Sequence, residues 1–252
     1  MRSLQEGETA MYGYGMDYTY IMFVMPAVIL SLIASYMVKS RFAYYDKVRS
    51  SRGITGAQAA ELLLRANGIT DVRIQHIRGQ LSDNYNPSTK VLSLSDSTYA
   101  SASIAAIGVA AHETGHAIQH NVGYSPLALR SSLVPVANIG SRFGPMLAVA
   151  GIILGASAQS VSSFQLFQLI TNIGLVLFGG AVLFYLITLP VEFNASFRAM
   201  TILRQTGTLD STELIGVRKV LTAAAMTYVA SALTAIGSLL RLIVLSNNRR
   251  RR

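Results

Sequence analysis

AAHETGHAIQ, residues 110–119, contains two histidines four positions apart, His112 and His116. On a helix, residues with this spacing stand one turn apart on the same face. Two neutral imidazoles so placed can hold one Zn²⁺, and Glu113 beside them can take a proton from a water on the metal. The alternative is a chance HExxH pattern, in a chain that has only four histidines.

The motif requires a helix, and the sequence predicts one over residues 103–120. Its apolar positions surround nearly every side of the helix, which is typical of a helix buried in a domain core; they are Ile104, Ala105, Ile107, Ala110, Ala111 and Ile118. Buried histidines and a buried glutamate need partners, and a metal ion satisfies all of them at once.

The third metal ligand can be sought among the other histidines. His120 continues the series of four, but a continuous helix puts it about 12 Å from His112, too far for one ion with Zn–N bonds of about 2.1 Å. We therefore interpret His120 as a helix-end residue. His76 lies upstream in a strand-like run and remains a reserve candidate.

After His116 the chain has three carboxylates, Glu192, Asp210 and Glu213. The last two form the pattern of a helix N-terminus, with Asp210 as cap and Glu213 reaching back. Elimination leaves Glu192, which a second helix would contribute to a His-His-Glu zinc site. The alternative is an interfacial helix in which this glutamate serves only as a cap.

Three stretches together resemble a known family: AAHETGHAIQ, PVEFNAS (190–196) and SDNYNPSTKVLSLS (82–95). They are similar to the YugP-type neutral membrane zinc metallopeptidases, which are distantly similar in arrangement to the HtpX-type membrane gluzincins. The resemblance implies a membrane-embedded endopeptidase with one zinc ion on His112, His116 and Glu192 and with Glu113 as base. Gluzincins commonly carry an Asp four residues after the ligand Glu. Here that position is Ser196, whose hydroxyl can make the same contact to a ligand histidine.

The composition is that of an integral membrane protein. Of the 252 residues, 51% are hydrophobic and 13% are charged, and the mean hydropathy is +0.42; this is too apolar for a soluble domain of that length. The net charge of +9 comes from basic residues beside apolar spans, so positive-inside topology explains it and no nucleic acid is expected. Cysteine is absent, which excludes disulfides.

The expected fold is an integral membrane α-helical protein with a small α+β zincin-type peptidase domain at the membrane surface and three to four transmembrane helices. In chain order we expect an N-terminal tail (1–17), a transmembrane helix (18–38), the first part of a cytoplasmic zinc-protease domain (39–130), two transmembrane helices (134–158 and 164–189), the second part of the protease domain (190–219), a helix (220–246) and a basic tail (247–252). Because Arg241 and the tail argue against a crossing, a fourth span stays open.

Basic residues set the expected orientation. Lys39 and Arg41 follow the first span, which puts the N-terminus outside and the active site on the cytoplasmic side of a bacterial plasma membrane. Within the protease domain, Thr55 with Gln58 predicts a capping box, and Gly68 predicts the end of that helix.

A strand over residues 72–77 and a hairpin through residues 84–88 should precede the zinc helix. A peptide substrate could add to a sheet edge as an extra strand. The candidate edge is Lys90, Val91, Leu92, Ser93 and Leu94; the alternative is an ordinary hairpin.

The sequence thus predicts a zinc endopeptidase that acts on polypeptides in or near the lipid bilayer. Tyr228 and Arg198 are candidate donors to the developing oxyanion. The rival hypothesis is a catalytically silent membrane scaffold, or a regulatory subunit, that binds a partner protein. Glu113 argues against it, because a structural metal site has no use for a base. A regulatory membrane protein is a further candidate partner.

Overall fold

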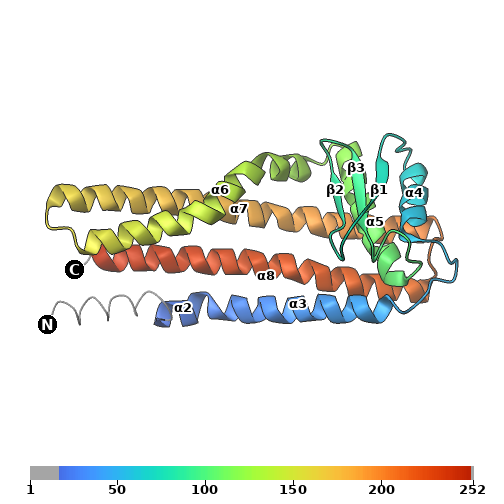
Figure 1. Cartoon of the computed structure of the whole chain (residues 1–252), viewed down its shortest axis with the longest axis horizontal. Helices are drawn as coiled ribbons and strands as arrows, with labels where there is room; N and C mark the ends of the chain where they lie inside the picture. The colour runs from blue at the N-terminus through green and yellow to red at the C-terminus, as the bar shows by residue number, and fades with distance from the viewer. Residues whose placement is uncertain (1–16, 251–252) are drawn as a thin grey trace. The chain divides into compact units, whose positions relative to one another are not determined.

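The computed structural model describes the backbone of residues 17–250 and the side chains of residues 17–248. The expected N-terminal tail, except Asp17, lies outside the described residues, as does the end of the basic tail. The elements in chain order are α2 (Tyr18–Phe23), α3 (Met25–Tyr45), α4 (Gly56–Ala66), β1 (Arg73–Ile77), β2 (Asn84–Asn86), β3 (Val91–Ser95), α5 (Ile104–Asn121), α6 (Ser125–Ala156), α7 (Val161–Gln205) and α8 (Ser211–Arg250) (Figure 1).

The chain divides into two compact units, and α3, α6, α7 and α8 each contribute to both. We call the first the helical unit; of the described residues it comprises 17–33, 132–186 and 229–250. We call the second the mixed unit; it comprises residues 34–131 and 187–228 and holds the three strands with α4 and α5. The mixed unit contains every candidate site residue predicted from the sequence.

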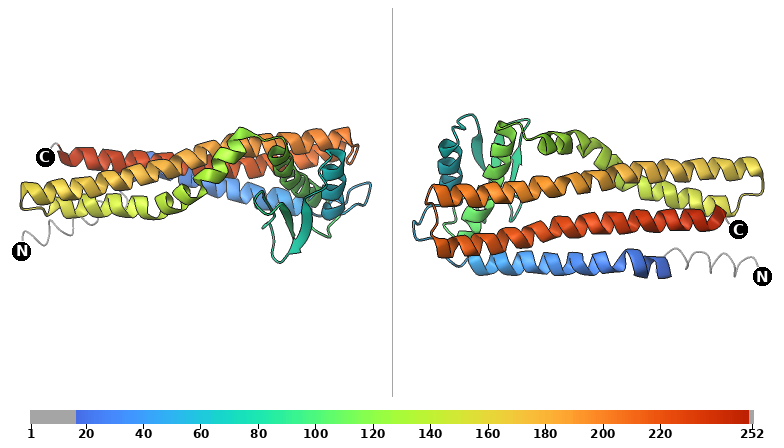
Figure 2. Two further views of the ribbon diagram at one scale, coloured as in Figure 1. Left: turned by 90° about the horizontal axis from the view of Figure 1, so that it is seen from above. Right: turned by 180° about the vertical axis from the view of Figure 1, so that it is seen from behind.

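In the helical unit, small residues allow α6 and α7 to pack backbone against backbone (Figure 2). A Cβ added to Gly140 would stand 2.2 Å from the carbonyl oxygen of Leu177, and one on Gly174 would stand 2.4 Å from the amide nitrogen of Ala148. Glycine-mediated contact of this kind is typical of helices that associate within a membrane.

In the described part of the chain, four helices are long and apolar enough to cross a membrane: Met25–Tyr45, Ser125–Ala156, Val161–Gln205 and Ser211–Asn248. The fourth is longer than the sequence indicated, because α8 is one continuous helix. Arg241, which argued against a crossing, has its Nε 3.5 Å from Asp17 Oδ1, and its guanidinium lies over the ring of Tyr20. A partly buried arginine with such partners is compatible with an apolar helix bundle.

The third predicted span, 164–189, is part of a longer helix. The second helix expected around Glu192 is continuous with this span, because α7 runs through Pro190 to Gln205. Proline removes one helical hydrogen bond and crowds the carbonyl of the preceding turn, but the turns on either side can maintain the helix when they are packed. Glu192 and the residues after it therefore lie on the same helix as the apolar run before them.

In the mixed unit, the predicted helix ends are confirmed. Thr55 and Gln58 form the capping box of α4, and Gly68 has a φ of +67°, which favours glycine after a helix. Asp210 caps α8: its Oδ1 accepts from the backbone of Thr212 and Glu213, while Glu213 Oε2 accepts from the Asp210 amide.

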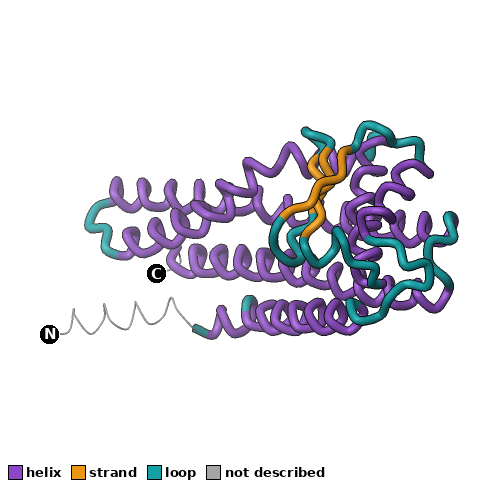
Figure 3. The backbone as a smooth tube through the Cα atoms, turned by 45° about the vertical axis from the view of Figure 1, so that its right-hand side comes forward, coloured by secondary structure: helices purple, strands orange, loops and turns teal. Residues whose placement is uncertain are grey.

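The sheet has the order β1-β3-β2, with β1 parallel and β2 antiparallel to β3. Its strands are the orange part of the backbone tube (Figure 3). The predicted substrate edge, Lys90, Val91, Leu92, Ser93 and Leu94, is therefore wrong: all but Lys90 belong to β3, which is hydrogen-bonded on both sides. Every residue of β3 is buried. A run of apolar residues just before α5 indicated a strand but could not tell a central strand from an edge.

α5 occupies the centre of the mixed unit. Ser103 caps it by accepting from the amide of Ala106 and donates its own hydroxyl to Asp46. Fourteen of its eighteen residues are buried, against α4, the sheet, α7 and α8. The helix predicted over residues 103–120 is confirmed as Ile104–Asn121 with Ser103 as its cap.

Candidate metal centre

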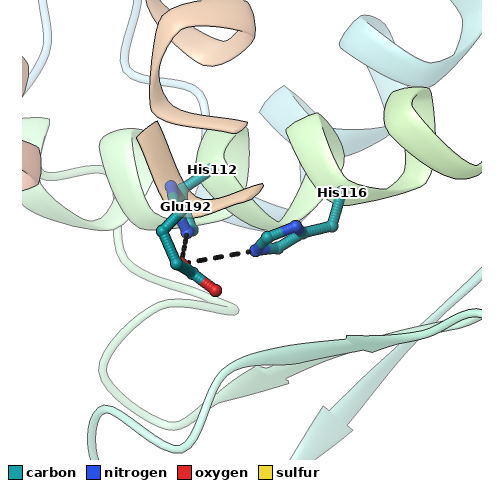
Figure 4. A group of neighbouring side chains, drawn as sticks. All are labelled: His112, His116 and Glu192. Atoms are coloured by element: carbon teal, nitrogen blue, oxygen red, sulfur yellow. Dashed lines mark hydrogen bonds and ion pairs between the residues drawn. The ribbon is translucent and has the colours of Figure 1, made fainter. Parts of the chain in front are cut away.

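Three side chains from two helices converge in the mixed unit (Figure 4). His112 and His116 come from α5 and Glu192 comes from α7. Glu192 Oε2 lies 3.1 Å from His112 Nε2 and 3.6 Å from His116 Nε2. Their candidate ligand atoms all lie within 4.8 Å of one another.

These separations fit a zinc ion. Tetrahedral ligands about 2.1 Å from an ion stand roughly 3.4 Å from each other, close to the two distances above. Two imidazoles and one carboxylate are also the donor set of a catalytic rather than a closed structural zinc site. The residues present therefore suit zinc in both spacing and chemistry.

Each histidine is oriented through its second ring nitrogen. His112 Nδ1 lies 3.1 Å from Ser196 Oγ, and His116 Nδ1 lies 3.0 Å from Gln119 Oε1. Such contacts fix the ring of a ligand histidine and leave the other nitrogen for the metal. Ser196 makes the contact that the position four residues after Glu192 was expected to make.

Gln119 determines the tautomer of His116. Its Nε2 donates to the carbonyl oxygen of Val191 at 2.8 Å and to Asn194 Oδ1 at 3.0 Å. A carbonyl oxygen only accepts, so the amide nitrogen must face it and Oε1 must face His116. In the neutral imidazole of His116, Nδ1 therefore carries the proton and Nε2 has a free lone pair. Gln119 is fully buried.

Glu192 is 2% exposed, and its other oxygen meets a cation. Oε1 lies 3.0 Å from Arg130 Nη1 on α6, in an electrostatic contact that is not aligned as a hydrogen bond. Each of the three candidate ligands thus has its own partner: Ser196 for His112, Gln119 for His116 and Arg130 for Glu192.

The carboxylates also act on His116. Burial lowers the pKa of His116, but the hydrogen bond to Glu192 and the charges of Glu113 and Glu192 outweigh it, so the pKa is raised above its ordinary value of 6.5. Glu113 is itself buried at 9% exposure. A cation at this position would therefore meet two carboxylates in a site with little water.

The two candidate oxyanion donors differ in position. The Tyr228 hydroxyl lies close enough to Glu192, Glu113 and Arg130 to interact electrostatically with all three. Arg198 is engaged elsewhere: its Nε donates to Asn194 Oδ1, and its guanidinium lies over the ring of Tyr124. Of the two, Tyr228 is the one whose electrostatic surroundings include both carboxylates of the candidate site.

The other two histidines make separate contacts. His76 on β1 bonds Asp96 Oδ1 at 2.6 Å, and His120 Nδ1 lies 2.8 Å from the hydroxyl of Tyr85 on β2. Neither belongs to the group that could hold a metal. The bond from His120 connects α5 to the edge of the sheet.

Sequence reasoning missed Gln119 and Arg130. Gln119 had a usable signal, because it follows His116 by three and so lies on the same helix face. Arg130 had none: it is far from Glu192 in the sequence, and only the tertiary structure brings the two together.

Comparison with known proteins gives two matches over nearly the whole chain. A family model described as "Putative neutral zinc metallopeptidase" matches residues 20–247. The chain is also 44% identical over 231 residues to the "Putative membrane protease YugP" of Bacillus subtilis (strain 168), which covers 92% of this chain and 98% of that protein. No solved structure matches the chain. Both α5 and the Glu192 region of α7 fall inside the family match.

Proposed function

Since the chain belongs to the neutral zinc metallopeptidase family, we propose that it is a membrane-embedded endopeptidase whose zinc ion is bound by His112, His116 and Glu192. The observation that carries the proposal is the convergence of two Nε2 atoms and one Oε2 atom, with Nδ1 of each histidine turned to a separate partner. Burying these polar groups without a ligand would lower the stability of the protein, and a bound metal ion would offset that cost.

Bound zinc would polarise a peptide carbonyl and make a water molecule acidic enough to lose its proton near neutral pH. Glu113 is the base that accepts this proton and the acid that returns it to the leaving amine. Its position next to His112 on α5 and its burial support that role. Tyr228 is the proposed donor to the oxyanion that develops on the peptide carbonyl.

The proposed substrates are polypeptides, bound in extended form. β3 is paired on both sides, so a substrate strand would add at β2 (Asn84–Asn86), which is hydrogen-bonded to β3 alone within the sheet. The Tyr85–His120 hydrogen bond supports this edge, because it ties β2 to the helix that carries both histidines.

We also propose the topology expected from the charges. The N-terminus lies outside, the metal site is on the cytoplasmic side, and α3, α6 and α7 cross the membrane. The charge rule does not favour a crossing by α8, because its basic C-terminal end would then lie outside; that crossing is proposed from the length and apolar composition of α8 instead. The four apolar helices and the basic residues that follow the first of them support this. Membrane proteins and proteins bound to the membrane are then the accessible substrates.

The test measures zinc content and cleavage of an unfolded model protein by the full chain in detergent. Wild type should hold one zinc per chain and cleave, because all parts of the site are present. Glu113→Gln should keep zinc and lose activity by about 10²–10⁴-fold, whereas Glu192→Ala should lose zinc. Glu61→Gln, an exposed glutamate paired with Arg65, is the control and should match wild type.

Each contrary result has one meaning. If Glu192→Ala keeps its zinc, the third ligand lies elsewhere and His76 becomes the next candidate. Zinc in wild type with no cleavage of any polypeptide would support the scaffold hypothesis instead.

A further inference from the structure

A groove of about 330 Å³ lies between α7 and α8 in the mixed unit, a volume within the range of small-ligand sites. Its apolar lining includes Phe193, Phe197 and Met200 from α7, with Leu221 and Met226 from α8. Phe193 is 49% exposed and Phe197 is 69% exposed, whereas Leu221 is buried in the floor. Exposed aromatic side chains beside a groove of this kind indicate a surface that is covered in the working protein.

Two arginines, Arg204 and Arg218, line the same groove. Arg204 is in the last turn of α7 and Arg218 is near the start of α8, and residues 206–210 join the two helices. Both arginines therefore lie toward the connection. No carboxylate lines the groove, and among the residues that the structure describes neither arginine forms an ion pair. The groove offers positive charge without a protein anion to neutralise it.

An extended peptide does not suit this groove. Its backbone N–H and C=O groups would need partners, but both walls are helices whose backbone groups are bonded internally. Apart from the arginines, the polar lining consists of the hydroxyls of Ser196, Thr201 and Thr222. A hydrocarbon chain needs no hydrogen bonds, so the lining fits an amphiphile with an apolar chain and an anionic head.

The polarity of the groove also matches a lipid. Along α7 the apolar run comes first, then Phe193, and Arg204 follows about 16 Å farther on. The charged end therefore points away from the apolar run, as a phospholipid head group does. Basic pockets between transmembrane helices bind anionic head groups. We propose that an anionic phospholipid occupies the groove, with its phosphate between Arg204 and Arg218 and an acyl chain along Phe193 and Phe197.

The test uses the full chain in vesicles of phosphatidylcholine with about 30% phosphatidylglycerol, which gives the vesicle surface a negative potential. A trace of phosphatidylglycerol carries a photoactivatable acyl chain, and a parallel sample carries the same chain on phosphatidylcholine. After irradiation, mass spectrometry locates the labelled peptides. We expect the phosphatidylglycerol probe to label residues 193–204 and 218–226 at least about fivefold more than the phosphatidylcholine probe, since each arginine contributes roughly that factor.

The double variant Arg204→Gln/Arg218→Gln should remove this preference, and Lys219→Gln should keep it. Lys219 is the matched control because it is basic, exposed and adjacent, yet does not line the groove. Zinc content and helical circular dichroism confirm that each variant is folded. Equal labelling by the two probes, labelling outside these peptides, or unchanged labelling in the double variant would overturn the lipid site. None of these readouts depends on peptidase activity, so the outcome is independent of the proposed function.

Discussion

The carbonyl oxygen of Ala195 on α7 lies 2.5 Å from the point where a Cβ on Gly115 of α5 would stand. The two helices therefore meet backbone to backbone at the middle of the histidine motif. Gly115 lies between the histidines in the sequence, and Ala195 lies between Glu192 and Ser196. The absence of a side chain at position 115 sets the separation of the ligands from the two helices.

Gly115→Ala should therefore weaken zinc binding at least about tenfold and destabilise the protein by about 1–3 kcal/mol, because the neighbouring atom is backbone and a helix must shift. Equilibrium zinc binding and thermal unfolding in detergent check this. Gly179→Ala, where a Cβ would meet nothing within 4 Å, is the control and should be neutral. If Gly115→Ala binds zinc like wild type, the close approach does not set the site geometry.

Gln119→Met should weaken zinc binding by about 10–100-fold, because His116 loses the acceptor that orients its ring. Methionine is similar in size, so packing changes little. Gln119→Glu keeps an acceptor for Nδ1 and should bind zinc more tightly than Gln119→Met. Competition with a chromophoric chelator measures both affinities. Equal zinc affinity in Gln119→Met and wild type would mean that packing alone orients His116.

Arg130→Met should destabilise the zinc-free protein by about 2–3 kcal/mol, because Glu192 is then a buried carboxylate without its cation. This loss of unfolding free energy is smaller than the loss for a fully buried pair, because the Arg130 side chain is 28% exposed. Zinc supplies the missing positive charge, so the loss should be smaller in the loaded protein. Thermal unfolding with and without zinc tests this. Arg65→Met breaks an exposed pair with Glu61 and should cost below about 1 kcal/mol. An identical loss in both states would contradict the assigned role.

Removing zinc with a chelator should lower the thermal stability of wild type, and added zinc should restore it. Zinc at about 1,000 times its dissociation constant stabilises the folded state by about 4 kcal/mol. Scanning calorimetry at fixed protein and detergent concentration measures the shift. Glu192→Ala should show little response to the chelator. A response as large as that of wild type would remove Glu192 from the ligand set.

The sequence was sufficient for the parts of the site that depend on local spacing. The four-residue interval predicted that His112 and His116 share a helix face, and Ser103 and Thr55 marked where helices begin. These features depend on neighbours within one or two turns, so a single sequence contains them.

Features that depend on distant segments were harder to predict. The burial of β3 depends on β1, which pairs with β3 in parallel although β2 lies between them in the sequence, and this strand order is set by tertiary packing. Arg130 reaches Glu192 only because α6 and α7 meet in the fold. Arg241 argued against a crossing in the sequence, and its partners Asp17 and Tyr20 are brought to it only by the fold.

The candidate ligands are divided between positions 112 and 192 of one chain, with α6 and most of α7 between them. A ribosome adds both histidines and Glu113 long before it adds Glu192. During that interval the growing chain carries the base but lacks the carboxylate that completes the metal set. Synthesis itself therefore delays activity: the proposed enzyme remains latent until its two central apolar helices have been made, with no propeptide required for the delay.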